Sequence, residues 1–347
     1  MKINIRKVMG ESSMNKRIEF LDIAKGILII TVILSHSPWP LASYMYWFHM
    51  PAFFIISGIL YRDNVDFKKQ LTKFYIPYLS FSIFDILFNF AMYPGMASME
   101  SFFLSLRNYI YSGKATWGVF WFIPVLLMTK FLFSKLRSAF KTPYIIFIVI
   151  VGYVLVHMYS IRVIPNLITD INNDYWFPLN IDVVPMALAY YSLGFYSKNI
   201  LNYLTTKISL IVSGLGCLVL IYINVSQGIY FYINMKSSYY KSTGWDLIFP
   251  ICFTIFILAI SNNLPNGYLR RFLNYCGANS LIIMYLHKPL GTLMLRIFPS
   301  IGWLGFTLSG LLLSLMFNLI INKSSLLKTL FKGKYAMFSI NNAKESF

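Results

Sequence analysis

The stretch RIEFLDIAKGILIITVILSHS, residues 17–37, decides the fold, because a long apolar run here encloses Asp22, Lys25 and His36. A membrane-spanning helix needs about 20 mostly apolar residues, and this run supplies them. A basic segment precedes the run, as it would in a signal peptide. However, the run is long, it carries charges, and no A-x-A cleavage signal follows it. We therefore expect a membrane span that is retained in the protein.

Ionisable residues inside a span are costly and usually functional. Lys25 and His36 are eleven residues apart, which is about three helical turns, so both side chains project from one face about 16 Å apart along the axis. Pro38 ends the helix just beyond His36. Asp22 precedes Lys25 by three residues and can pair with it as an orienting partner. The alternatives are a lysine that snorkels to the interface and a helix-end histidine that meets water.

The composition of the whole chain agrees with a membrane protein. Of 347 residues, 57% are hydrophobic and 12% are charged, whereas soluble domains carry about 25% charged residues. We predict an all-α, polytopic integral membrane protein with about ten transmembrane helices, between a basic tail at 1–17 and a basic tail at 323–347. The apolar stretches within the transmembrane domain, 18–322, are 18–37, 47–61, 74–95, 117–134, 143–160, 180–197, 208–229, 245–263, 279–297 and 301–322.

The net charge of +18 follows the expected topology. With both termini cytoplasmic, 22 of the 30 lysines and arginines lie on the cytoplasmic side, two lie within spans, and six lie outside: Arg107, Lys114, Arg162, Lys236, Lys241 and Arg296. This asymmetry obeys the positive-inside rule, so the basic charge is explained without a nucleic acid partner. Two longer outer loops, 96–116 and 161–179, suit an extracytoplasmic polar ligand.

Three further histidines accompany His36. His49 opens the second stretch, YWFHMPAFFIISGILYRD (46–63), and the connection of about ten residues makes it a neighbour of His36. His287 lies near the middle of the ninth stretch. His157 has no polar neighbours in its apolar stretch, and we interpret it as a structural residue. In the second stretch, Gly58 allows a close helix approach.

The sequence lacks the usual metal and nucleophile motifs. It contains no HxxxH or HExxH spacing and no acidic cluster, and its cysteines, Cys217, Cys252 and Cys276, form no CxxC pair. We therefore expect neither a metal site nor a disulfide. No GxSxG motif is present either. A histidine can still act as a general base on a substrate hydroxyl.

Lys25-x10-His36 resembles the Arg/Lys-x10-His signature of acyltransferase family 3, the bacterial integral-membrane O-acyltransferases. FHMPAFFIISGILYR (48–62) resembles that family's second span, and its His-Met-Pro variant is similar to the fucose 4-O-acetylase-like subgroup and to capsule O-acetyltransferases. WFIPVLLMTKF (121–131) and CGANSLIIMYLH (276–287) resemble two further blocks. This sequence departs from the commoner pattern in having Lys25 instead of arginine, which removes bidentate phosphate geometry.

The resemblance implies an enzyme of the bacterial plasma membrane. It would transfer an acyl group, usually acetyl, from cytoplasmic acyl-CoA to a hydroxyl of a cell-surface glycan or its lipid-linked precursor. Acyl-CoA is then a donor substrate, and no permanently bound cofactor is expected. His36 is the expected base, and His49 or His287 would orient it or stabilise the oxyanion.

The donor would approach along the face of the first span. Lys25, together with Lys69 and Lys73 in KKQLTKFYIPY (68–78), would meet the CoA phosphates. The alternative for Lys69 and Lys73 is simple positive-inside charge. Trp121 would line the channel or serve as a packing aromatic.

A transporter or exporter of surface polysaccharide is the main alternative function. Lys25, Asp22, Asp85 and His287 could line a proton or substrate path through a membrane. Against this reading, the sequence shows no inverted repeat and no paired broken helices. A structural membrane scaffold would leave the ionisable face of the first span unexplained. The bilayer, acyl-CoA and a glycan are therefore the expected partners, with no oligomeric state specified.

Overall fold

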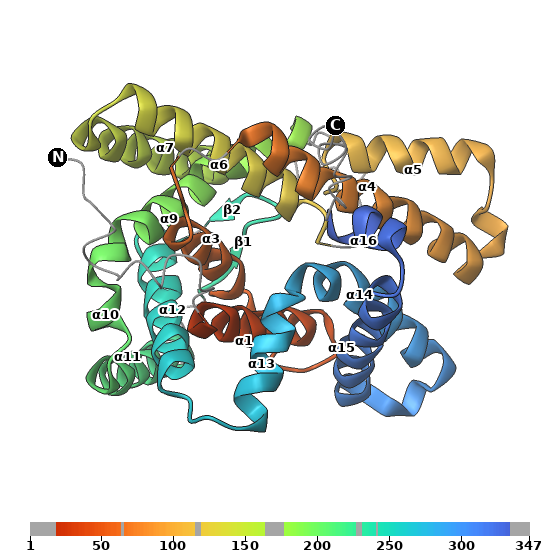
Figure 1. Ribbon diagram of the computed structural model, residues 1–347. Helices are drawn as coiled ribbons and strands as arrows, with labels where there is room; N and C mark the ends of the chain where they lie inside the picture. Colours follow the sequence, from red (N-terminus) through yellow and green to blue (C-terminus); the bar gives the residue numbers. More distant parts are fainter. Residues whose placement is uncertain are drawn as a thin grey trace, which may run out of the picture.

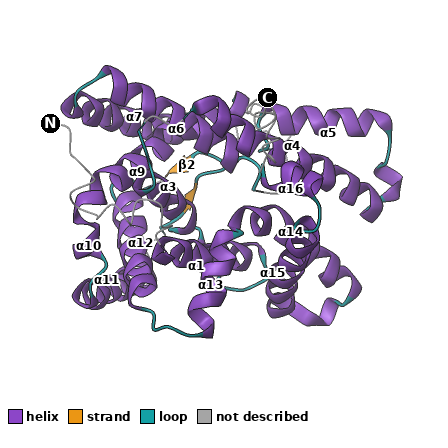
Figure 2. Cartoon of the chain, viewed as in Figure 1, coloured by secondary structure: helices purple, strands orange, loops and turns teal. Residues whose placement is uncertain are grey.

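The computed structural model describes residues 19–63, 66–114, 119–163, 177–226, 231–240 and 242–333. The described residues are almost entirely helical, so the all-α prediction is confirmed (Figure 2). The exception among them is a short antiparallel hairpin in which β1 (Ile233–Asn234) pairs with β2 (Tyr239–Tyr240). The predicted N-terminal tail at 1–17 lies outside the described residues.

The helices follow one another through short connections. In chain order they are α1 (Glu19–His36), α2 (Ala42–Met45), α3 (His49–Ile59), α4 (Phe67–Met92), η3 (Pro94–Met96), α5 (Met99–Tyr111), α6 (Phe122–Ala139), α7 (Thr142–Arg162), η4 (Pro178–Val183), α9 (Val184–Tyr196), η5 (Ser197–Ile200), α10 (Leu201–Leu204), α11 (Lys207–Ser226), α12 (Trp245–Asn263), α13 (Tyr268–Ala278), α14 (Ser280–Ile297), η6 (Pro299–Ile301), α15 (Gly302–Ile321) and α16 (Ser325–Lys332).

Five of the described helices are long and apolar enough to cross a membrane: α4, α7, α11, α12 and α15 with η6. They coincide with five of the ten predicted stretches, and the chain is a multi-pass membrane protein. Two of the other predicted spans form short helices, because α3 has 11 residues and α9 has 13, whereas a straight crossing takes about 20. The count of ten spans and the side of the termini stay predictions.

Helix α1 lies at the centre of the molecule, where α3, α12, α13, α14 and α15 pack around it (Figure 1). Its apolar side chains are buried on several faces; Ile23, Ala24, Leu28 and Ile33 are all 0% exposed. The Asp22 and Lys25 side chains of α1, which are 4% and 20% exposed, therefore face mainly protein. This is the arrangement in which such residues are tolerated within a membrane domain.

Glycines allow two pairs of helices to approach closely. Gly58 of α3 and Gly194 of α9 each face the backbone of the other helix, and a Cβ at either position would overlap a carbonyl oxygen. Gly26 of α1 and Gly277 of α13 form the same kind of contact. The close approach predicted at Gly58 is confirmed. Small residues at such crossings let helix backbones pack without a gap.

The Gly194→Ala variant should lower the thermal stability of the purified protein. The new methyl group would overlap the carbonyl oxygen of Ile55, so α3 and α9 must separate, and overpacking of this kind costs about 1–3 kcal/mol. Gly95→Ala is the matched control, because nothing lies within 4 Å of a Cβ there. Equal melting temperatures of the two variants in lipid would show that the α3–α9 contact relaxes freely.

The segments outside the predicted spans contain more structure than expected. The predicted outer loop 96–116 holds α5, which Ser98 caps by accepting a hydrogen bond from the Ser101 amide at 3.0 Å. Of the loop 161–179, residues 164–176 lie outside the described residues. The first part of the predicted C-terminal tail forms α16, whose Phe331 ring lies 4.9 Å from that of Phe81 on α4.

Candidate active site

Three histidines gather near the end of α1. His36 is the last residue of α1, His49 is the first residue of α3, and His287 lies within α14. The His36 Nδ1 and His287 Nε2 atoms are 3.3 Å apart. The Tyr46 ring lies 6.2 Å from the His36 ring and 5.2 Å from the His49 ring. The structure therefore places His36 and His287 in contact, and Tyr46 lies near both His36 and His49.

Backbone carbonyls orient all three imidazole rings. Nδ1 of His36 lies 2.8 Å from the Val32 oxygen, Nδ1 of His287 lies 2.9 Å from the Ile283 oxygen, and Nδ1 of His49 contacts the Met45 oxygen. A carbonyl oxygen only accepts, so each Nδ1 carries the proton and donates it. In the neutral ring the lone pair is then on Nε2. The single Nδ1–H of His36 is shared: it donates to the Val32 oxygen at 2.8 Å and, at the longer distance of 3.3 Å, to the Nε2 of His287.

Exposure separates the roles that the three histidines can play. His49 and His287 are 1% and 0% exposed, whereas His36 is only partly buried. Among these three rings, His36 is therefore the one that a substrate can reach. Its Nε2 lone pair is available for a proton, while His287 holds the opposite side of the ring. This geometry suits a general base with a supporting partner.

Positive charges surround the histidine pair. Lys288 follows His287 on α14 and acts electrostatically on both His36 and His287. Lys236 lies in the turn of the β1–β2 hairpin, outside the membrane-spanning segments. Burial, followed by the charges of Lys288 and Lys114, lowers the pKa of Lys236 to about 8. The sequence analysis counts Lys236 only as an outer-side charge and Lys288 as one of the two cations within spans, and the folded chain places Lys288 beside the histidine pair.

The other end of α1 carries the predicted ion pair. Lys25 Nζ lies 2.6 Å from Asp22 Oδ1, and the Asp22 side chain is 4% exposed. The predicted pairing of Asp22 with Lys25 is thus confirmed. A cavity of 380 Å³ adjoins this pair, and its lining includes Asp22, Glu19, Arg271 and Tyr275. Arg271 was missed because the Arg270–Arg271 pair looked like ordinary loop charge, and only the packing of α13 on α1 moves it to Asp22.

Lys69 and Lys73 lie elsewhere. Both are exposed on the first turns of α4. The Nζ atoms of Lys73 and Lys130 lie 5.9 and 5.3 Å from the centre of the Phe74 ring. Neither lysine lines the cavity beside Asp22. Their predicted role in donor binding stays a prediction.

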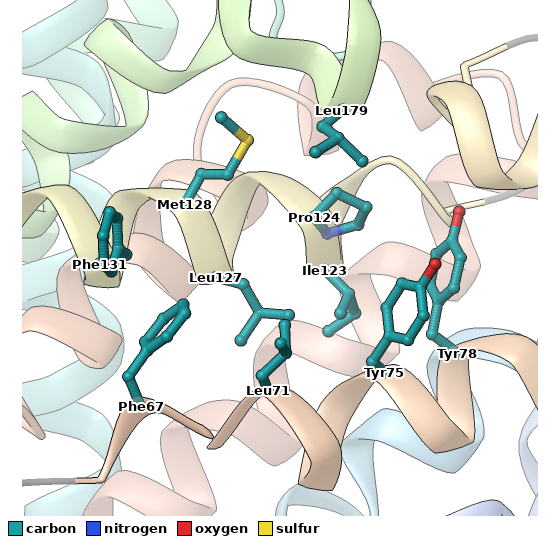
Figure 3. Close-up of a pocket in the computed structure, with 10 residues that line it drawn as sticks. All are labelled: Phe67, Leu71, Tyr75, Tyr78, Ile123, Pro124, Leu127, Met128, Phe131 and Leu179. Carbon is teal, nitrogen blue, oxygen red and sulfur yellow. The ribbon is translucent and has the colours of Figure 1, made fainter. Parts of the chain in front are cut away.

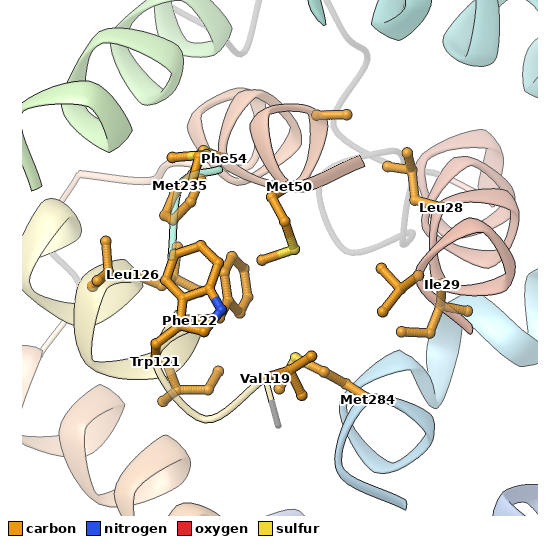
Figure 4. Packing of buried hydrophobic residues seen from close by; sticks show 14 of the residues in the cluster. Leu28, Ile29, Met50, Phe54, Val119, Trp121, Phe122, Leu126, Met235 and Met284 are labelled. Carbon is orange, nitrogen blue, oxygen red and sulfur yellow. The ribbon is translucent and has the colours of Figure 1, made fainter. Parts of the chain in front are cut away.

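Apolar side chains pack beside the middle of α1, between the Asp22–Lys25 pair and His36. Leu28 and Ile29 of α1 point toward Met50 of α3, Met284 of α14 and Trp121 at the start of α6 (Figure 4). Trp121 is 4% exposed and packs within this cluster. A ligand that reached from Asp22 and Lys25 to His36 would therefore pass hydrocarbon and thioether groups.

His157 does have polar company, contrary to the sequence-based expectation. Its Nε2 lies 2.6 Å from Asp246 Oδ2, and its Nδ1 lies 2.8 Å from the Tyr153 oxygen. The Tyr153 hydroxyl donates to Asp246 Oδ1 at 2.6 Å. The partner was missed because Asp246 is 89 residues away and only the packing of α7, α12 and the hairpin brings it close. These hydrogen bonds join α7 to α12, which gives His157 a structural role.

The fold is that of a multi-pass membrane protein with a pair of histidines in contact at the end of its central helix. The profile of acyltransferase family 3, described as an acyltransferase domain, matches residues 18–323. The chain belongs to this family and is an acyltransferase. Neither a curated protein nor a solved structure matches the chain significantly.

Proposed function

We propose that the protein transfers an acetyl group from cytoplasmic acetyl-CoA to a hydroxyl of an extracytoplasmic glycan or its lipid-linked precursor, as a bacterial capsule or fucose O-acetyltransferase would. The observation that carries this proposal is the His36–His287 pair at one end of α1, with the Asp22–Lys25 pair at the other. A single helix thus joins a charged donor end to an imidazole base. The transporter alternative has no comparable support, because the family is one of acyltransferases.

His36 acts as the general base in this mechanism. Its Nε2 removes the proton from the acceptor hydroxyl, whose oxygen attacks the thioester carbonyl. The carbon–sulfur bond then breaks, and the CoA thiolate leaves with the proton that His36 gives back. His287 holds the ring by accepting from Nδ1–H and stabilises the imidazolium while it exists. Lys288 supplies positive charge for the oxyanion. His49 and Tyr46 close the side of the active site next to His36.

The donor binds with its phosphates at the cavity beside Asp22. Lys25 and Arg271 provide the cations there, because Lys25 pairs with Asp22 and Arg271 lines the same cavity as Asp22. To reach His36, the pantetheine arm would pass Leu28, Ile29 and Trp121, whose buried side chains belong to the apolar core (Figure 4). Lys69 and Lys73 contribute long-range attraction for the polyanion at the cytoplasmic surface.

The proposal is tested first at the level of the reaction. Purified protein in lipid should bind acetyl-CoA, and proton NMR of surface polysaccharide should show an acetyl signal that a deletion strain lacks at normal polysaccharide yield. An unchanged acetyl signal with reduced surface polysaccharide would instead support an exporter. Transfer of a longer acyl group would retain the enzyme and correct the donor.

Replacement of Arg271 by alanine should raise KM for acetyl-CoA with little change in kcat. A hydrogen bond to a charged group contributes about 1.5–3 kcal/mol, so an increase of about tenfold or more is expected. Arg270→Ala is the matched control, since Arg270 pairs with Glu19 at 3.1 Å and does not line the cavity. If both variants change KM equally, the effect is general surface charge and the cavity is not the phosphate site.

A further inference from the structure

The β1–β2 hairpin lies beside α3, close to the histidine cluster (Figure 1). Tyr232 acts electrostatically on Tyr46, whose ring lies 6.2 Å from the ring of His36. Met235 is 4% exposed and belongs to the same core cluster as Met50 of α3. The hairpin therefore borders the end of α1 at which the candidate base lies.

Hydrogen bonds fix the turn of the hairpin, which runs from Met235 to Ser238. The Ser238 amide donates to the Met235 oxygen at 3.2 Å and closes the turn. Ser238 has a φ of 52°, in the left-handed region that is unfavourable for residues other than glycine. Its hydroxyl donates to the Asp182 carboxylate of η4, which holds it there. The turn therefore keeps Lys236, its second residue, at a defined place.

Three lysines from different elements converge at this turn: Lys236 of the turn itself, Lys114 just after α5, and Lys288 of α14. Lys114 is 3% exposed and pairs with Asp182. Burial, followed by the charges of Lys288 and Lys114, lowers the pKa of Lys236 to about 8, so this side chain stays mostly protonated at neutral pH. Lys288 also acts on His36. We call these three residues the lysine group.

Membrane topology does not explain the lysine group. In the predicted topology, Lys114 and Lys236 lie on the outer side, where the positive-inside rule disfavours basic residues. Bringing like charges together in a partly buried place is also costly. The carboxylates of Asp182 and Asp85 offset part of this charge, because Asp182 pairs with Lys114 and Asp85 acts on Lys288. Lys236 adds a further positive charge, which favours an anionic ligand.

The apolar cavity between α4 and α6 does not offer this chemistry. It measures 260 Å³, and its lining includes Phe67, Leu127 and Met128 (Figure 3). The hydroxyl of Tyr78, at one end of it, already donates to the Tyr109 oxygen. A ligand that carries charge therefore finds its partners at the lysine group and not in this cavity.

We propose that the acceptor glycan is acidic and that Lys236 binds a carboxylate or phosphate group on the acylated sugar or on its neighbour. The inference rests on the proposed function and deepens it, because it names the charge class of the acceptor. Lys288 adds attraction for the same anion and follows His287 in the sequence, so the bound group lies beside the hydroxyl that His36 deprotonates. Lys114, paired with Asp182, holds the turn in place.

The first test measures acceptor preference with the full chain in lipid nanodiscs and acetyl-CoA as the donor. The acceptor is surface polysaccharide from the deletion strain, used untreated, reduced at its carboxyl groups with carbodiimide and borohydride, or freed of phosphate with hydrofluoric acid. One of the two treatments should lower kcat/KM by about tenfold or more, the usual effect of losing a hydrogen bond to a charged group, and so identify the anion. Lys236→Gln should cause the same loss with untreated polymer and little further loss with the polymer that lacks the anion.

Arg107→Gln is the matched control, because Arg107 is another outer-side cation of the predicted topology and is exposed on α5. It should leave the preference for untreated polymer intact. Equal rates with all three polymers would overturn the inference. An equal effect of Lys236→Gln on untreated and treated polymers would do the same, since that pattern indicates a structural role. So would an increase in KM for acetyl-CoA alone, because Lys236 would then serve the donor.

A binding measurement that requires no acyl transfer separates this inference from the proposed function. Lys236 is acetylated with N-hydroxysulfosuccinimide acetate at a pH near its pKa, and its modification is measured by mass spectrometry. Glucuronic acid or glucose phosphate should protect Lys236, and the stronger of the two indicates the anion. Glucose, and sodium chloride at the same ionic strength, should not protect it, and the exposed Lys69 should stay reactive throughout.

Equal protection by sodium chloride would overturn the inference, because it indicates screening of charge without a site. Selective protection of Lys236 with absent acyl transfer would be a failure of the proposed function alone. Intact acyl transfer without selective protection would be a failure of this inference alone.

Discussion

Replacing His36 with alanine is expected to lower kcat for acyl transfer by about 10²–10⁴-fold, the usual contribution of a general base. Of the three clustered histidines, His36 is the partly exposed one, and its Nε2 holds the lone pair once Nδ1 donates to the Val32 oxygen at 2.8 Å. The affinity for acetyl-CoA should change little, because the proposed phosphate site lies near Asp22, at the other end of α1. Single-turnover transfer and equilibrium binding of acetyl-CoA, measured on the same preparation, separate the two quantities.

His36→Asn separates catalysis from structure. The asparagine amide can donate to the Val32 oxygen as Nδ1 does, but it offers no basic nitrogen. If His36 is the base, the asparagine variant should be as inactive as alanine while melting like the wild type. Recovery of activity in His36→Asn would show that the ring serves only to hold the end of α1, and the base would have to be sought at His287 or His49.

The second large effect is on stability. Asp246→Ala is expected to destabilise the protein by about 3–5 kcal/mol, the usual result of removing one partner of a buried ion pair. The variant would leave the Nε2 of His157, which lies 2.6 Å from Asp246 Oδ2, without its partner in a buried site. The variant would also leave the Tyr153 hydroxyl without the carboxylate that it contacts at 2.6 Å.

Reversible denaturation in lipid or detergent would measure this cost. Glu19→Ala is the comparison, because the Glu19 side chain is 51% exposed in its pair with Arg270, and exposed ion pairs contribute only about 0–1 kcal/mol. The interpretation would be wrong if the two variants unfolded at the same denaturant concentration. Asp246→Asn, which keeps the side-chain shape, should fall between the wild type and Asp246→Ala.

Local periodicity is the part of the fold that the sequence specifies. The run around Lys25 and His36 sets α1, the shared face and the Asp22–Lys25 pair, since all three depend on residues within a few turns. The short lengths of α3 and α9 were not predicted, because apolar composition alone does not mark where a helix ends. Helix α5 was also missed, since its sequence mixes polar and apolar residues in a segment read as a loop.

Long-range pairing is the part that the sequence did not supply. His287 was recognised as unusual by its position in an apolar stretch, yet its contact with His36 spans 251 residues and depends on how α14 packs against α1. Asp246 and Arg271 gave no local signal, because each looks like an ordinary charge at a helix terminus or in a loop. Packing of α12 and α13 gives these residues their neighbours.

Because α1 is buried on several sides, it holds Lys25 and His36 at a fixed distance from each other. The spacing between Lys25 and His36 is set by one uninterrupted helix, so it cannot adapt when the rest of the bundle moves. Inserting one residue between them would turn His36 by about 100° away from His287, whereas inserting a full turn would restore the direction but add about 5 Å. With Lys25 as the proposed donor site and His36 as the proposed base, the eleven-residue interval would fix the length of donor that can deliver its thioester to His36.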